Sequence, residues 1–239
     1  MNGRKSRILV EDPELAERLD EERRPGALRD CVADVIHIPA GAWPAGAQAP
    51  HVSYAIGLLV LDGLLTRRVG LDERFGAELL GAGDLLRPWQ REDAEAVLPH
   101  AGEWRVLSPC RIAVLDGDFA IRLARHPEVT ASLFDRAIRR SRQLAMNMAI
   151  VHQPRVDIRL HMLFWTFADR WGTVGPDGVR VPLRLTHAVL GELVAAQRQT
   201  VSKALGALDE RGAVRWTGKD WLLRGDRPVE LRAIGSISA

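Results

Sequence analysis

Cysteine is nearly absent from this sequence of 239 residues, which holds only Cys31 and Cys110. An iron–sulfur cluster takes about four cysteine ligands, so that chemistry is not expected. Because the two residues lie far apart in the sequence, we expect buried free thiols in a reducing compartment rather than a disulfide.

Long apolar runs and catalytic signatures are also missing. No stretch approaches the roughly 18 continuous apolar residues that a membrane span requires, and Met1 to Glu14 lacks the apolar core of a signal peptide. We therefore expect a cytoplasmic protein with no membrane partner. The serines form no G-x-S-x-G elbow, and the seven histidines form no H-x-H or H-x-x-x-H pair. The sequence thus predicts neither a catalytic residue nor a metal site, and no cofactor is identifiable.

The sequence does have an ordinary globular composition, with 46% apolar residues, and a length typical of one or two domains. The net charge of +2 is uneven, because residues from 154 onward hold 13 Lys and Arg against 9 Asp and Glu. That excess has the sign expected of a phosphate-binding module. Residues 1–30 are rich in both charges, and Leu15, Ala16 and Leu19 predict a short surface helix with a solvated charged face.

Residues 185–214 carry the most informative pattern, two short helical periods that meet at a tight turn. In the first period Thr186 is a suitable N-cap, and the apolar stripe consists of Leu190, Leu193 and Val194. Gly191 predicts a close approach of the two helices, and the short connection at 195–197 predicts a sharp crossing. This is the layout of a helix-turn-helix.

The second period separates apolar from polar residues. One side holds Val201, Ala204, Leu205 and Leu208, and the other holds Arg198, Gln199, Ser202, Lys203 and Gly206. Gln197 is a weaker N-cap than Ser or Asp, and Gly212 is expected to end the helix. A helix anchored on its apolar side in this way can present its polar side to the major groove of DNA.

Residues 154–224 resemble the winged-helix DNA-binding domain of the Crp-Fnr transcription regulators. The residues that carry the resemblance are Thr186, Leu190, Gly191, Val194, Arg198, Thr200, Val201, Leu205 and Gly212. Residues 214–216 and 221–223, on either side of a turn, predict the two strands of the wing. The resemblance implies a homodimer that binds double-stranded DNA at a pseudo-palindromic operator, with RNA polymerase as a further partner. A plain helical hairpin in another α-helical protein is the alternative.

Carried over residue by residue, the resemblance implies two classes of DNA contact. Base edges are assigned to Arg198, Gln199 and Lys203, and phosphates to Thr186, His187, Gln197, Thr200 and Ser202. Arginine can bind guanine and glutamine can bind adenine bidentately, each with a discrimination of about 1–3 kcal/mol. Many family members carry Glu at the position of Gln199, so we predict a half-site unlike the familiar one.

The first half of the chain has short strands separated by turn signals. We predict strands at 32–38, 54–61, 64–69, 77–80, 104–107 and 111–115, with a hairpin at Asp62-Gly63 and a reversal at 81–84. This resembles the cyclic-nucleotide-binding β-roll of the same family over about residues 30–117. The fold class is therefore α+β. The expected domains are a jelly-roll-like antiparallel β-roll for effector binding (1–127), a dimerisation helix (128–153) and a winged helix-turn-helix (154–239).

The residues that hold a cyclic phosphate in nucleotide-binding members are missing here. Our alignment places His100 and Ala101 where that clamp has an Arg and its hydroxyl partner, so cyclic AMP is not expected. The candidate pocket for an unknown small-molecule effector consists of Gly83, Asp84, Arg87, Trp89 and Arg91. The stretch from Arg87 to Arg91 resembles the corresponding segment of an actinobacterial-type branch of the family. We expect Trp43, Trp89 and Trp104 to fill the core, with an aromatic-effector pocket as the alternative.

Residues 129–151 predict one long helix with a narrow apolar seam at Leu133, Ala137, Leu144, Met148 and Val151. Such a seam indicates pairing with a second copy, and the family resemblance implies that Arg140 and Asn147 near it set the register. A helix packed on its own β-roll is the alternative. The next helix is expected at 156–171. We expect ligand or domain contacts to rotate the two DNA-binding domains of a dimer about residues 152–155, until their recognition helices are roughly 34–36 Å apart.

A cupin-like metal-binding enzyme or sensor with a DNA-binding tail is the alternative from another functional class. Only His51 falls near a suitable strand start, whereas non-haem iron or zinc chemistry needs about three protein ligands. The sequence therefore favours the regulator.

Overall fold

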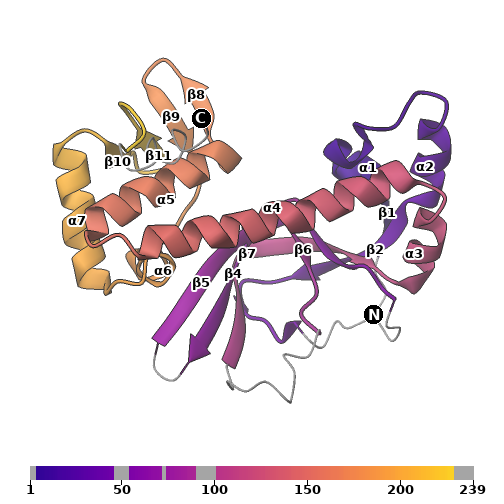
Figure 1. Cartoon of the computed structure of the whole chain (residues 1–239), viewed down its shortest axis with the longest axis horizontal. Coiled ribbons are helices and arrows are strands. Elements are labelled where there is room, and N and C mark those ends of the chain that lie inside the picture. Colours follow the sequence, from indigo (N-terminus) through magenta and orange to yellow (C-terminus); the bar gives the residue numbers. More distant parts are fainter. Residues whose placement is uncertain (1–3, 46–53, 72–73, 90–100, 229–239) are drawn as a thin grey trace, which may run out of the picture. The chain divides into compact units, whose positions relative to one another are not determined.

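A computed structural model describes residues 4–45, 54–71, 74–89 and 101–228 (Figure 1). The chain divides into two compact units, an N-terminal unit of residues 1–143 and a C-terminal unit of residues 144–239. The long helix α4 (Pro127–Val151) spans the boundary between them. Among the described residues, no helix is both long enough and apolar enough to cross a membrane.

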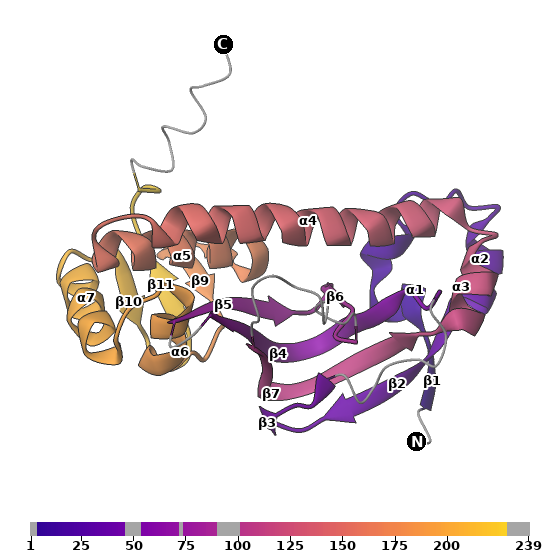
Figure 2. The same cartoon turned by 60° about the horizontal axis from the view of Figure 1, so that its bottom comes forward.

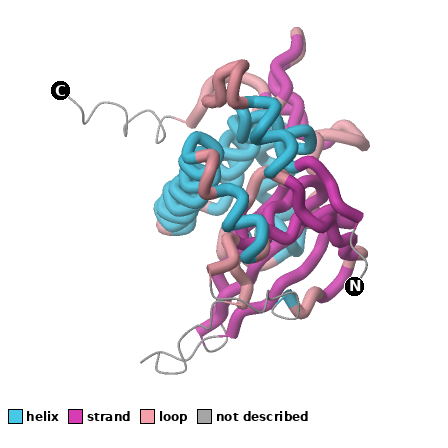
Figure 3. Tube along the Cα trace, turned by 90° about the vertical axis from the view of Figure 1, so that its right-hand side faces the viewer, coloured by secondary structure: helices cyan, strands magenta, loops and turns pink. Residues whose placement is uncertain are grey.

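The N-terminal unit is built on an antiparallel sheet of seven strands. Their order is β1-β2-β7-β4-β5, with β3 paired to β7 and β6 paired to β4. The strands are β1 (Arg4–Arg7), β2 (Val32–Ile38), β3 (Gly41–Ala42), β4 (Gly57–Leu71), β5 (Arg74–Gly81), β6 (Leu85–Leu86) and β7 (Ala101–Leu115). They are among the strands drawn in magenta in Figure 3. The predicted antiparallel β-roll and the α+β class are confirmed.

Strands β4 and β7 are each one long strand where the sequence predicted two. The hairpin expected at Asp62-Gly63 is wrong, because β4 continues through it alongside β7 with register shifts between Val60 and Leu65. Gly63 has a φ of +96°, and a Cβ there would lie 2.4 Å from the carbonyl oxygen of Pro109. The glycine therefore serves an irregularity in the ladder and a close backbone approach rather than a turn. The reversal expected at 81–84 is present, and the Asp84 carboxylate accepts a hydrogen bond from Gly81 N at 2.8 Å.

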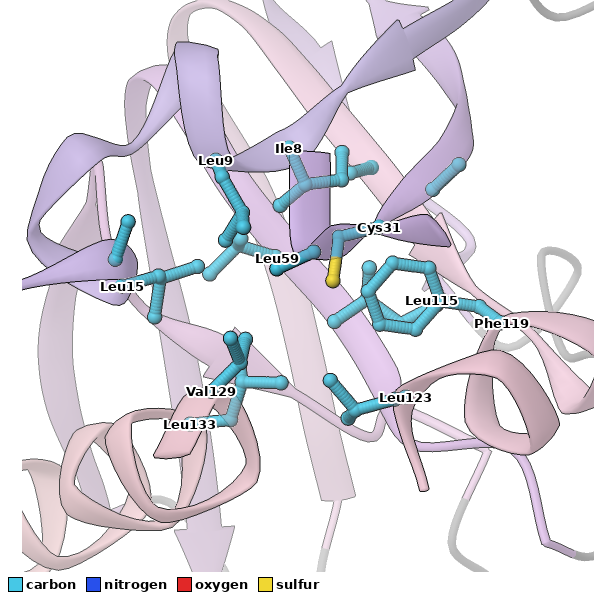
Figure 4. Close-up of a cluster of buried hydrophobic side chains, with 14 of the residues drawn as sticks. Ile8, Leu9, Leu15, Cys31, Leu59, Leu115, Phe119, Leu123, Val129 and Leu133 are labelled. Carbon is cyan, nitrogen blue, oxygen red and sulfur yellow. The ribbon is translucent and has the colours of Figure 1, made fainter. Parts of the chain in front are cut away.

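One end of the sheet is covered by short helices. These are α1 (Ile8–Glu11), a 3₁₀ turn (Pro13–Ala16), α2 (Arg24–Asp30) and α3 (Gly117–Leu123). Their apolar side chains join those of β4, β7 and α4 in one cluster, in which Figure 4 shows Leu15, Leu59, Phe119 and Leu133. The solvated face predicted for residues 1–30 is partly wrong, because Asp12 accepts two hydrogen bonds from the buried Arg136 at 2.8 and 2.9 Å.

A second apolar cluster fills the roll. Trp43 is buried in it, and Trp89 and Trp104 pack against it. The Trp43 and Trp104 rings meet edge to face with centroids 5.8 Å apart. Both cysteines are free and buried, as predicted, and burial raises the pKa of each thiol to about 11.

The first half of α4 packs on its own roll. Val129, Leu133 and Arg136 are buried on this face, and the half-buried Arg140 binds the Glu78 carboxylate of β5 at 2.6 and 3.1 Å. The predicted seam was therefore wrong at Leu133, which belongs to this inward face rather than to a surface for a second copy. The Arg140 side chain, which the sequence placed near that seam, likewise binds the roll at Glu78. The outward face of the helix instead exposes Phe134, Ile138, Leu144 and Met148.

The C-terminal unit combines helices with a second antiparallel sheet of order β10-β11-β9-β8, of which Figure 2 labels β9, β10 and β11. In chain order, the elements after α4 are α5 (Val156–Trp171), β8 (Thr173–Gly175), β9 (Gly178–Val181), α6 (His187–Leu193), α7 (Arg198–Glu210), β10 (Val214–Trp216) and β11 (Trp221–Leu223). Helix α5 meets the sheet at Trp221 of β11, whose ring centroid lies 4.7 Å from that of Phe164. The predicted helix at 156–171 and both wing strands are confirmed.

Candidate nucleic-acid interface

Helix α6 begins at the predicted cap. The backbone N–H of Val189 donates to Thr186 Oγ1 at 3.3 Å, which satisfies one of the N–H groups that a first helical turn leaves unpaired. Leu190 and Leu193 of α6, and Val194 after it, are buried as the apolar stripe predicts. Gln197 starts α7 without a side-chain capping bond, in line with its weaker capping preference.

The turn between α6 and α7 is tight. Ala196 N donates to Gly191 O at 2.9 Å, and a Cβ on Gly191 would lie 2.5 Å from the Ala196 carbonyl oxygen. The absence of a Cβ at Gly191 therefore leaves room for the backbone of the turn, in addition to the close approach of the second helix that the sequence predicts. Ala195 has a φ of +52°, a left-handed conformation that is uncommon for a residue with a side chain.

Helix α7 presents the two sides that the sequence predicts. Val201, Ala204, Leu205 and Leu208 are buried, while the opposite residues are exposed. A shallow hollow on the exposed side is lined by Gln197, Arg198, Gln199, Ser202 and Lys203. The structure thus brings all three predicted base-contact residues onto one open surface with two predicted phosphate contacts.

Two predicted phosphate contacts are joined to each other. His187 Nδ1 lies 2.8 Å from Ser202 Oγ, and that hydroxyl donates to the Arg198 carbonyl at 3.0 Å. Thr186 and Thr200 are also exposed.

The end of α7 leads directly into the wing. Gly212 has a φ of +67°, Gly212 N donates to Asp209 O at 2.8 Å, and Ala213 N donates to Leu208 O at 2.9 Å. This is the glycine-dependent helix end that the sequence predicts. The wing turn then places Lys219 beyond β10.

The wing also presents a side chain that the sequence reasoning did not assign to DNA. Trp216 is 41% exposed and packs on Trp221 with centroids 5.0 Å apart. The sequence predicted that Trp216 belongs to a wing strand, but a strand beside a turn does not indicate that its aromatic ring is exposed.

The comparisons with known proteins agree with this geometry. Residues 158–233 match the Crp-like helix-turn-helix domain. This part of the chain is therefore a Crp-like helix-turn-helix domain, and the chain as a whole is similar to Crp-Fnr regulators. Over 137 residues it is 31% identical to a CRP-like cAMP-activated global transcriptional regulator of Mycobacterium tuberculosis, a match that covers 56% of this chain. The chain spans 61% of the length of that curated relative.

Solved structures of Crp-Fnr proteins share the fold over most of the chain. A CooA variant from Carboxydothermus hydrogenoformans has a TM-score of 0.64 at 17% identity, covering 88% of this chain and 90% of that one. A cyclic nucleotide-binding domain containing protein from Listeria monocytogenes also has a TM-score of 0.64, at 13% identity, covering 91% and 97%. These likenesses concern the fold.

The predicted effector residues that the structure describes lie in different surroundings. Asp84 is buried and closes its own turn, Gly83 lies against the Arg136 guanidinium, Arg87 is exposed, and Trp89 is part of the core edge. Arg91 and His100 lie outside the described residues. A hollow in the described part of the roll is lined in part by Trp43, Trp104, Arg68, Glu103 and Arg105.

The described residues also bear on metal binding. Among them, no three His, Cys, Asp or Glu side chains come together as a metal site would require. His51 lies outside this part of the chain.

Proposed function

We propose that this chain is a sequence-specific transcription regulator that binds a pseudo-palindromic operator as a homodimer. The observation that carries the proposal is α7, whose apolar side is buried and whose Arg198, Gln199 and Lys203 are exposed together. A helix held from behind, with long hydrogen-bonding side chains in front, is the form in which helix-turn-helix proteins read a major groove. The matched curated regulator supports the same role.

The contacts divide into two kinds. Arg198, Gln199 and Lys203 read base edges, while Thr186, His187, Gln197, Thr200 and Ser202 bind phosphates and give affinity with a steep salt dependence. Arg198→Ala should therefore relax sequence choice, whereas Thr200→Ala should weaken all sites alike. Equal losses on operator and random duplexes for Arg198→Ala would contradict this division.

The homodimer forms through residues 129–151, along the outward face of α4. Phe134, Ile138, Leu144 and Met148 are exposed, and at 100° per residue they fall within a stripe about 120° wide. An apolar stripe of this kind on a long helix is suited to burial against its own copy. Ile138→Lys should shift the protein to monomers in sedimentation. Ile121→Lys, at an exposed position on α3, is the matched control and should leave the dimer intact.

The effector is a small molecule other than cyclic AMP, or the protein acts without one. The proposal rests on Ala101, which opens β7 where a clamp for a cyclic phosphate would need a hydroxyl group. RNA polymerase is the partner through which a bound dimer would act on transcription.

The test is selection of duplexes from a random DNA pool by the purified protein, without ligand and with cyclic nucleotide. A two-fold symmetric motif in the ligand-free arm would support the proposal. A motif that is enriched only with cyclic nucleotide would overturn the statement on the effector. No symmetric motif in either arm would contradict the DNA-binding dimer.

A second measurement tests the reading residues. Gln199→Glu exchanges a side chain that can pair with adenine for a pure acceptor suited to a cytosine amino group. The variant should select a motif that differs from the wild-type motif at one symmetric position. An unchanged motif would mean that Gln199 does not read a base.

A further inference from the structure

One arginine of the C-terminal unit contacts backbone carbonyls at two breaks between helices, the one after α4 and the one after α6. Helix α4 ends at Val151 and α5 begins at Val156, so the Gln153 carbonyl lies in the break between them. Helix α6 ends at Leu193, so the next two carbonyls lie in the turn before α7. Arg159, in the first turn of α5, donates from Nε to Gln153 O and from Nη1 to Val194 O at 3.0 Å and Ala195 O at 3.3 Å.

The chemistry of these contacts favours arginine specifically. The last carbonyls of a helix carry partial negative charge, so a cation at the end of α6 is stabilising. A guanidinium offers five N–H donors in a rigid plane, whereas an ammonium is a compact point charge. Arg159 can therefore hold the break after α4 and the turn after α6 at the same time. A lysine would reach one of them.

The turn that Arg159 holds is conformationally strained. Ala195 has a φ of +52°, which its Cβ disfavours. Among the residues that the structure describes, no other residue with a side chain has a positive φ. Arg159 binds the carbonyl that precedes the Ala195 Cα and the carbonyl that follows it. The guanidinium thus fixes both peptide groups that a relaxation of Ala195 would rotate.

A second tie supports the same arrangement. Asp157, also in the first turn of α5, binds Arg155 at 2.8 Å and Arg211 at 2.9 Å, and Arg211 caps the C-terminal end of α7. Partial burial alone would raise the pKa of the Asp157 carboxyl, but the hydrogen bonds from Arg155 and Arg211 outweigh it and lower that pKa. The start of α5 is therefore joined to the turn before α7, through Arg159, and to the C-terminal end of α7, through Asp157 and Arg211.

We propose that Arg159 is a positioning residue for DNA recognition. By tying the end of α4 to the turn between α6 and α7, it passes any displacement of that end to the recognition helix. This proposal rests on the proposed DNA-binding function, because its consequence is measured on DNA. It assigns Arg159 no contact with DNA.

The experiment compares Arg159→Met and Arg159→Lys with Arg155→Met as the matched control. Arg155 is in the same stretch, but its guanidinium binds a side chain rather than the two carbonyl sites. The first readout is hydrogen exchange of the turn at 191–197 in DNA-free protein. The second is affinity for the duplex selected by the wild-type protein and for random DNA of the same length.

For Arg159→Met we expect faster exchange in the turn and an affinity for the selected duplex that falls about tenfold. Affinity for random DNA should change by less than about twofold, because phosphate contacts tolerate a tilted helix better than base contacts do. Arg159→Lys should lose nearly as much as Arg159→Met, and Arg155→Met should lose less than about twofold. Ala195→Gly, which removes the strain, should restore part of the affinity in the Arg159→Met background.

Equal losses on both duplexes, or unchanged affinity for the selected duplex, would overturn the positioning role. If Arg159→Met does not fold, Arg159→Lys decides by the same two readouts. A wild-type protein that selects no motif would contradict the proposed function instead. In that case hydrogen exchange in the turn would still show whether Arg159 holds it.

Discussion

Two arginines of α4 face inward in the N-terminal unit, whereas the basic residues of the recognition surface in the C-terminal unit face outward. The side chains of Arg136 and Arg140 are 9% and 19% exposed and bind carboxylates within the roll. Arg198 and Lys203 on α7 are exposed and bind no carboxylate in the described part of the chain. The same residue type thus holds a fold in one unit and is left available to a polyanion in the other. A count of charges cannot make this distinction, because burial and partners decide it.

The largest effect is expected where an inward arginine is removed. Arg140→Met removes the guanidinium that binds Glu78, a residue 6% exposed, at 2.6 Å, and breaking a buried pair in this way costs about 3–5 kcal/mol. Hydrogen exchange of β4 and β5 should accelerate accordingly. Arg139→Met is the matched control, because Arg139 is 61% exposed and should change stability by less than about 0.5 kcal/mol. Equal effects of the two variants would remove the distinction between inward and outward arginines.

The next effect sharpens the comparison within the C-terminal unit. Gly191→Ala places a Cβ 2.5 Å from the Ala196 carbonyl oxygen, and such overpacking costs about 1–3 kcal/mol. Gly206→Ala is the matched control on the exposed side of α7, where a Cβ meets nothing within 4 Å. That variant should gain about 0.5–1 kcal/mol, because alanine is the better helix former. Urea unfolding of both variants measures the difference, and the same sign for both would contradict the role assigned to Gly191.

These two variants also mark how far the sequence carries. Thr186, Gly191 and Gly212 make their structural contacts with residues only a few positions away in the sequence. Their local pattern therefore predicted the helix-turn-helix and the exposed side of α7. Glu78 and Arg140 lie 62 positions apart, and neither local period nor composition signals such a pair. The hairpin expected at Asp62-Gly63 failed for the same reason, since the pairing of β4 with β7 across the sheet overrides a local turn signal. The seam on α4 was misplaced at Leu133 because helical spacing does not state which face a roll will cover.

A smaller effect concerns acid stability and the Asp157 tie. The folded pKa of Asp157 lies below its ordinary value of 3.8, so its stabilisation is complete above that value and is lost as pH falls through the lowered folded pKa. Asp157→Asn should therefore reduce the free energy of unfolding at neutral pH. The difference between wild type and variant should shrink as the pH is lowered below 3.8. Urea midpoints at both pH values measure it, and a difference that grows toward acid would reverse the assigned sign.

The smallest effect on stability is expected at Arg198, where the outward arginine contributes little to the fold. Its side chain is exposed and stands in the first turn of α7, where the positive end of the helix dipole disfavours a cation. Arg198→Ala should therefore leave the free energy of unfolding within about 0.5 kcal/mol of wild type. The same variant should lose about 1–3 kcal/mol of discrimination between the selected duplex and random DNA. A marked loss of stability with no loss of discrimination would place Arg198 with the inward arginines. The opposite result would show that a cation is kept at an unfavourable helix end because it meets DNA there.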